Sequence, residues 1–173
     1  MRKIIYLIFC SIVILILIAG CSQSTPEATK DKPNHVGEEH KHTTHAENGD
    51  LQETTASMGV APQFLNGKPE DMKTIYLAAA NNKDLLEQIP CYCGCGDSAG
   101  HRDNYDCFIH ENKKDGKVVW DDHGTRCGVC LETAVESILQ LKNGKSVKAI
   151  RNYIDEKYKE GFAKPTPTPM PKG

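Results

Sequence analysis

The sequence predicts an all-α protein, a small bundle of three to four helices with a cysteine-rich irregular loop, preceded by a signal helix and a disordered tether. Three observations support this prediction. Apolar residues recur at helical spacing in several segments after residue 69. This periodicity is lost across 91–125, where glycines are frequent, and six of the eight cysteines lie within Cys91–Cys130. Residues 58–164 are enough for one small domain whose core has only marginal stability without cross-links or metal.

The N-terminus has the pattern of an export signal. Arg2 and Lys3 precede an apolar run over residues 4–19, which is typical of a secretory signal peptide. The sequence Ile18-Ala19-Gly20-Cys21 matches the bacterial lipobox, so we expect residues 1–20 to be a lipoprotein signal peptide and Cys21 to be lipid-modified. The protein would then be lipid-anchored on the extracytoplasmic face of the cell membrane. The alternative is an uncleaved transmembrane anchor, for which the run is barely long enough.

Residues 21–57 are expected to form a flexible tether behind the lipidated cysteine. Residues 22–57 are rich in Ser, Thr, Glu, Lys and His and nearly lack large apolar side chains, so they cannot bury enough surface to offset the entropy of ordering. A disordered tract rich in His can capture transition metals weakly. The alternative is that these histidines are only solvated spacer residues. The candidate residues for weak metal capture are His35, His40, His42 and His45.

The domain over 58–164 should begin with two helices. Pro69 at a helix start, followed by acidic residues in the first turn, predicts a helix over 69–81. A second, short helix is expected over 84–89, and it must end before Pro90. Residues 91–125 are expected to be loop, in which only Lys117–Trp120 resembles a strand.

Two longer helices should follow the loop. The apolar pattern resumes at Cys127 and ends at Asn143-Gly144, a sequence that favours helix termination. Ser146 is the expected N-cap of a last helix, whose apolar stripe reaches Tyr158. The chain ends in a Pro-rich tail over 165–173, for which an extended, polyproline-like conformation is expected.

The cysteines are the candidate functional residues. Cys91, Cys93 and Cys95 occupy alternate positions around Gly94, and thiolates spaced this densely can reach one soft ion, Cu(I) or Zn(II), at about 2.3 Å. The pair Cys127 and Cys130 lies at a helix start, where the helix dipole favours thiolate. The predicted metal ligands are therefore Cys91, Cys93, Cys95, Cys107, Cys127 and Cys130, with His101 and His123 as second-rank ligands.

Other uses of the thiols are open. Exported cysteines meet oxidants, and the six could form three disulfides, although three bridges at one five-residue loop would be strained. Alternatively, Cys127 and Cys130 alone could act as a redox pair. The formal net charge of −2 argues against nucleic-acid binding, and hydrolase and kinase motifs do not stand out.

The motif resembles a known family. Residues 90–95 spell Pro-Cys-Tyr-Cys-Gly-Cys, the hexapeptide of the PCYCGC motif-containing lipoproteins of Gram-positive bacteria. The similarity continues through Gly96, Gly100-His101, Asn104, Cys107-Phe108, Val119-Trp120, His123-Gly124, Cys127 and Cys130. The resemblance carries no established activity, so metal handling is inferred from composition.

A looser similarity covers the C-terminal half. Cys127-Gly-Val-Cys130, a helix, Asn143–Ser146 and a second helix resemble the three-helix thiol-oxidoreductase domain of cytochrome c maturation. The resemblance implies that Cys127 and Cys130 cycle between dithiol and disulfide with a thiol-redox partner protein. The sequence departs from that domain in its four additional cysteines and its His-bearing loop.

The sequence therefore favours binding over catalysis. We expect a membrane-anchored lipoprotein that holds a soft metal through Cys thiolates and exchanges it with a metal-transfer partner. Metal-free protein should then lose structure mainly in 91–125. The alternatives are an exported thiol-disulfide oxidoreductase and a disulfide-stabilised structural envelope or spore-coat protein.

Overall fold

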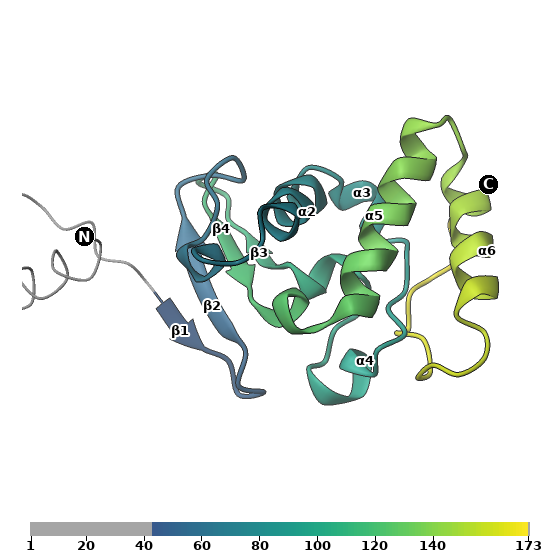
Figure 1. The fold of residues 1–173 in the computed structure, drawn as a ribbon, viewed down its shortest axis with the longest axis horizontal. Coiled ribbons are helices and arrows are strands. Elements are labelled where there is room, and N and C mark those ends of the chain that lie inside the picture. The colour runs from purple at the N-terminus through teal and green to yellow at the C-terminus, as the bar shows by residue number, and fades with distance from the viewer. Residues whose placement is uncertain (1–42, 173) are drawn as a thin grey trace, which may run out of the picture. The chain divides into compact units, whose positions relative to one another are not determined.

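The fold is mixed, with a four-stranded antiparallel sheet beside the helices, so the all-α prediction is wrong. The computed structural model describes residues 43–172 (Figure 1). The strands are β1 (Thr43–His45), β2 (Leu51–Thr55), β3 (Ile109–Asn112) and β4 (Val118–Asp121), in the order β1-β2-β4-β3. Only β4 was expected, from the apolar residues near Trp120.

The missed strand β2 is polar in sequence yet partly buried, because its side chains have partners elsewhere in the chain. Gln52 donates to the Asp121 carboxylate at 3.1 Å, and the Trp120 indole donates to Thr55 Oγ1 at 2.7 Å. The Glu53 carboxylate accepts the backbone N–H of Gln63 at 2.7 Å. Each buried polar group is thereby hydrogen-bonded, which offsets its desolvation. Periodicity of apolar residues cannot detect such a strand.

The long helices confirm the sequence analysis. Pro69 and the acidic first turn start α2 one residue after the proline, and Ser146 caps α6 by accepting the Ala149 N–H at 3.2 Å. The short helix expected over 84–89 is α3, which spans Lys83–Leu86 and ends three residues earlier than expected. Among the α-helices only α4, within the expected loop, was missed. The helices are α2 (Glu70–Ala80), α3 (Lys83–Leu86), α4 (Cys95–Ser98), α5 (Gly128–Lys142) and α6 (Val147–Lys157), with short 3-10 helices at Gln63–Leu65, Tyr105–Cys107 and His123–Arg126.

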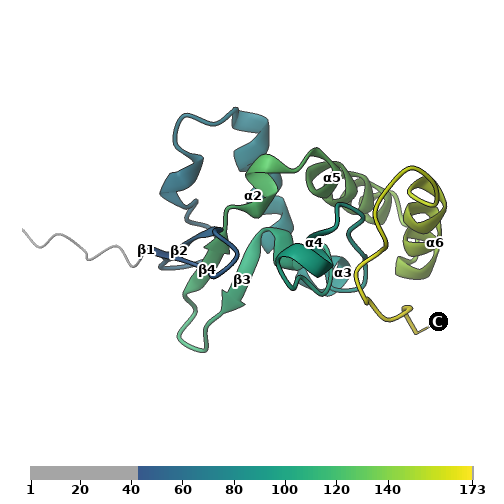
Figure 2. The ribbon, with the colours of Figure 1, turned by 90° about the horizontal axis from the view of Figure 1, so that it is seen from below.

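The helix α2 lies between the sheet and the antiparallel pair α5 and α6, as two perpendicular views show (Figures 1 and 2). Tyr76 of α2 joins the two sides, because its ring meets that of Phe108 edge to face at 5.0 Å and its hydroxyl donates to the Asp121 carbonyl at 3.0 Å. Trp120, Phe108 and Tyr76 are completely buried. Within residues 43–172, each helix is too short or too polar to cross a membrane.

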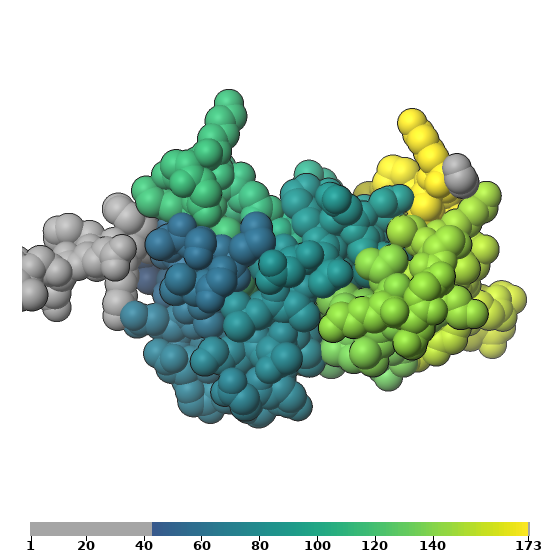
Figure 3. Space-filling view, turned by 90° about the horizontal axis from the view of Figure 1, so that it is seen from above, coloured from purple at the N-terminus to yellow at the C-terminus, as the bar shows by residue number. Residues whose placement is uncertain are grey.

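The folded unit extends beyond the predicted limits of 58 and 164. Residues 43–55, assigned to the tether, form β1 and β2, and His45 lies exposed on β1. In the tail, Thr166 and Thr168 are buried, and the tail (yellow) lies beside residues of the last helices (lime), with its outermost atoms projecting from the surface (Figure 3). The predicted signal peptide, Cys21 and the histidines His35, His40 and His42 lie outside the described residues.

Candidate metal centre

All six cysteines of the domain meet where three chain segments converge. Cys91, Cys93 and Cys95 lie between α3 and the first turn of α4, and Gly94 turns the chain there with a φ of 91°, a conformation that favours glycine. Cys107 ends a 3-10 helix, and the pair Cys127 and Cys130 starts α5. All six thiols are free. The structure thus brings together every cysteine that the sequence predicted as a ligand.

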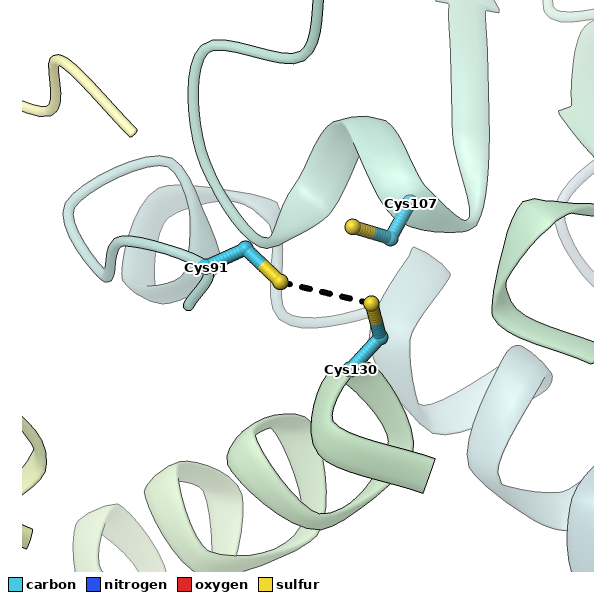
Figure 4. A group of neighbouring side chains, drawn as sticks. All are labelled: Cys91, Cys107 and Cys130. Carbon is cyan, nitrogen blue, oxygen red and sulfur yellow. Dashed lines mark hydrogen bonds between the residues drawn. The ribbon is translucent and has the colours of Figure 1, made fainter. Parts of the chain in front are cut away.

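Three thiols form the centre of the group, which we call the thiol triangle: Cys91, Cys93 and Cys130. The sulfur atom of Cys91 lies 3.3 Å from that of Cys130 and 3.4 Å from that of Cys93, and the third side is 3.5 Å. Figure 4 shows Cys91 and Cys130 pointing toward each other, with Cys107 beside them.

The other three cysteines, Cys95, Cys107 and Cys127, are the flanking thiols, and each completes one side of the thiol triangle. Cys107 joins Cys91 and Cys130, Cys95 joins Cys91 and Cys93, and Cys127 joins Cys93 and Cys130. In each of these three groups the sulfur atoms lie within 4.8 Å of one another. Cys95 and Cys107 are 3.8 Å apart.

These separations suit thiolates that share a metal. Sulfur atoms bound at about 2.3 Å to one tetrahedral or trigonal ion lie about 3.8 to 4.0 Å apart. A disulfide bond is about 2.05 Å long, much shorter than the 3.3 to 3.8 Å found here. An ion therefore requires shifts of only a few tenths of an ångström.

The two predicted histidines border the thiols. His101 Nδ1 lies 3.5 Å from the Cys107 sulfur, and His123 Nε2 lies 3.9 Å from the Cys93 sulfur. The two rings meet edge to face, with centroids 4.6 Å apart. Asp50, between β1 and β2, contacts His123 Nδ1 at 3.2 Å and fixes the orientation of that ring.

Hydrogen bonds within the group divide the thiols into two kinds. Hydrogen bonds from Cys127, Cys130 and Cys91 lower the pKa of Cys93. The pKa of Cys107 is lowered by Cys130, Cys91 and Cys95. Conversely, hydrogen bonding with Cys107 raises the pKa of Cys91, Cys95 and Cys130. The lowered pKa favours the thiolate form at Cys93 and Cys107.

The histidines respond to these two thiolates. The contact with Cys93 raises the pKa of His123 to about 9. Burial, the largest single effect, lowers the pKa of His101, but the hydrogen bond with Cys107 together with the charges of Cys107 and Asp121 raises the pKa overall. The contact with Cys93 thus favours positive charge on His123 beside the sulfurs, where a metal cation could take its place.

The centre is accessible from one side. Cys91, Cys95, Cys107 and Cys130 are buried, whereas Cys93 and Cys127 are half-buried. A surface hollow of about 360 Å³ reaches Cys93, Cys95, Cys127 and His123, with Asp50 and Arg126 at its wall. An ion arriving from solvent would meet Cys93 and Cys127 before the deeper thiols.

Three residues near the centre were missed by the sequence analysis. Thr166 of the tail holds the backbone of Cys91 from both sides, since its Oγ1 accepts the Cys91 N–H at 2.9 Å and its N–H donates to the Cys91 carbonyl at 3.0 Å. Asn104 donates to the Cys130 carbonyl at 3.2 Å. Asp50 orients His123. Asn104 lies within the family-like pattern, but Asp50 and Thr166 lie in segments of low apolar content that give no pattern signal.

Comparison with known proteins identifies one family. A family model described as a protein of unknown function with PCYCGC motif matches residues 10–171. Neither the curated proteins nor the solved structures contain a match to this chain.

Proposed function

The chain belongs to the family of proteins with the PCYCGC motif, and from this premise we propose that it is a membrane-anchored extracytoplasmic lipoprotein that binds Cu(I) or Zn(II) through its cysteine thiolates. The observation that carries the proposal is the convergence of six free thiols from three segments, with sulfur separations of 3.3 to 3.8 Å. Soft thiolate ligands favour these two ions over Mg(II) or Ca(II).

The chemistry of the donor set supports a metal over an unliganded thiol cluster. Four of the six thiols are buried, and ionising several of them together without a cation would leave uncompensated charge in the interior. Cu(I) or Zn(II) supplies the compensating positive charge, so that thiolates that would repel one another become ligands of one ion. His101 and His123 would then serve as further ligands or as hydrogen-bond donors to sulfur.

The membrane location rests on sequence. The run over 4–19 and the lipobox Ile18–Cys21 support acylation of Cys21, which would hold the domain at the outer face of the membrane.

The half-buried thiols Cys93 and Cys127 would face the hollow through which a metal-transfer protein could exchange the ion.

The test measures thiol state and metal on one sample of the full chain, exported by its own signal and purified without reductant or chelator. We expect six free thiols after denaturation and bound copper or zinc before it. An intact mass six hydrogens below the reduced chain, with no metal, would show three disulfides and overturn the proposal in favour of a structural envelope protein.

A second candidate function is thiol-disulfide exchange by Cys127 and Cys130, which lie at the start of α5 with the Cys130 N–H donating to the Cys127 sulfur at 3.4 Å. The hydrogen bond with Cys130 lowers the pKa of Cys127, but contact with Cys93 and burial raise it overall, which disfavours an attacking thiolate. A redox protein would keep reductase activity in Cys93→Ser and lose it in Cys127→Ser. A metal site would lose metal in both.

A further inference from the structure

We infer that the six thiols hold a cluster of at least three Cu(I) ions, in which the thiolates of the thiol triangle each bridge two ions; this inference rests on the proposed function. The geometry that carries it is the sharing of sulfurs between neighbouring groups. Cys91 belongs to the groups completed by Cys95 and by Cys107, and Cys130 to those completed by Cys107 and by Cys127. Cys93 belongs to the groups completed by Cys95 and by Cys127.

Each group of three sulfurs is a place for one ion. Three ions then occupy the three sides of the thiol triangle, and each is bound by two bridging thiolates and one flanking thiolate. A fourth place lies at Cys95, Cys107 and His101, whose ligand atoms are also within 4.8 Å of one another. Cys95 and Cys107 would bridge in that case.

The short sides of the thiol triangle favour this cluster over separate sites. Thiolates that belong to different mononuclear sites repel one another, so they should lie farther apart than thiolates of one site. Cys91, Cys93 and Cys130 lie only 3.3 to 3.5 Å apart, within a few tenths of an ångström of the separation expected for thiolates on one ion, so they are too close to serve separate sites. A cation on either side of a bridging sulfur removes this repulsion.

The charge and the number of donors select Cu(I) for the cluster. Six thiolates carry six negative charges, and three or four monovalent ions leave the cluster anionic by about two or three charges beside His101, His123 and Arg126. Zn(II) prefers four donors at each ion. In the proposed cluster each ion is bound by three thiolates, which is one donor too few for zinc. Copper therefore fits a shared cluster, whereas zinc fits a single ion.

The test is an anaerobic titration of the full, reduced, metal-free chain with Cu(I) as its acetonitrile complex. Native mass spectrometry gives the stoichiometry, and copper K-edge absorption shows whether copper ions lie next to one another. We expect three or four ions per chain and a copper–copper scattering shell. One or two ions with sulfur neighbours only would overturn the cluster and leave the proposed function standing, as would binding of Zn(II) alone in a parallel titration. Failure to bind either metal would overturn both.

Two variants at the start of α5 separate a bridging from a flanking role. Cys130→Ser removes a sulfur shared by two groups and should lower the stoichiometry by about two ions, whereas Cys127→Ser should lower it by about one. Cys130 is buried, so circular dichroism checks that both variants remain folded. If Cys130→Ser unfolds, the half-buried bridging residue Cys93 replaces it as Cys93→Ser. Equal losses in folded bridging and flanking variants would contradict the assigned roles.

Discussion

Gly124 shows how little room the residues behind Cys107 leave. A Cβ atom at this position would lie 2.8 Å from Phe108 Cε1, 2.9 Å from the Tyr76 hydroxyl and 3.0 Å from the Cys107 carbonyl oxygen. The tyrosine and the carbonyl are both fixed by the core. We therefore expect Gly124→Ala to lower the free energy of unfolding by about 1 to 3 kcal/mol, as overpacking does elsewhere.

Chemical denaturation of the reduced, metal-free chain measures this change. The matched control is Gly128→Ala at the first turn of α5, where a Cβ would meet no atom within 4 Å. Because alanine favours helix over glycine, the control should leave stability unchanged or raise it by about 0.5 to 1 kcal/mol. Equal effects in the two variants would refute the close packing around Gly124.

At the scale of single residues, most of the candidate site could be predicted from the sequence. The six cysteines and the two histidines are residue types that bind metals, which is evident from the sequence without knowledge of the fold. The spacing of Cys91, Cys93 and Cys95 alone predicts that their sulfurs lie close together. Sequence could not predict that Cys91, Cys93 and Cys130 lie at the centre, since that depends on the packing of α5 against the 91–95 segment. Asp50 and Thr166 could not be predicted either, because their roles also depend on contacts between segments far apart in the sequence.

At the scale of elements, the C-terminal tail holds the backbone of the motif over residues 90–95 in place. Thr166 pairs with the backbone of Cys91, and Thr168 donates to the Arg102 carbonyl at 2.7 Å. Arg151 of α6 fixes the tail by donating to the carbonyls of Thr168 and Pro169 at 3.2 and 3.0 Å. The tail thus contributes two of the contacts that hold Cys91 in place.

Removing the Arg151 side chain should weaken the contacts between the tail and Cys91. In Arg151→Ala we expect the amide hydrogens of Cys91 and Thr166 to exchange about tenfold faster, because the hydrogen bonds lost are worth on the order of 1 to 2 kcal/mol. Hydrogen exchange followed by mass spectrometry measures the change. Lys148→Ala, an exposed position on the same helix, should leave both amides unaffected. Unchanged exchange in Arg151→Ala would show that the tail is held by other contacts.

The elements differ in how well their sequences predict them. The helices α2, α5 and α6 carry apolar stripes bounded by helix start and stop signals, so their positions were predicted to within one or two residues. The strand β2 is stabilised by Gln52, Glu53 and Thr55, whose partners lie 10 to 69 positions away in sequence. Local pattern contains no information on such partners, and the sheet was therefore missed.

At the scale of the whole molecule, the metal would act as a local cross-link on a domain that already has its own core. The sheet, α2 and α5 pack through Trp120, Phe108 and Tyr76, none of which is among the proposed ligands. By contrast, α4 has only four residues. Metal removal should therefore loosen part of the chain and leave the rest folded.

We expect chelation under reducing conditions to raise hydrogen exchange at 91–101 while β4 and α5 after its first turn stay protected. This is a narrower region than the 91–125 expected from sequence, because β3 and β4 lie inside that range and belong to the core. Comparison of the metal-bound and chelated full chain tests it. Equal loss of protection in β4 would mean that the metal holds the whole domain together.

The placement of the β3–β4 hairpin between Cys107 and Cys127 also sets an order of events during folding. Cys91, Cys93 and Cys95 are neighbours in sequence, so they form a ligand set with almost no loop to close. The second half of the site joins them only after the hairpin has docked, because closing a loop of this length costs entropy that the sheet must first offset. An ion caught by the nascent chain would thus rest on three thiols, and completion of its coordination would report that the domain has reached its native topology.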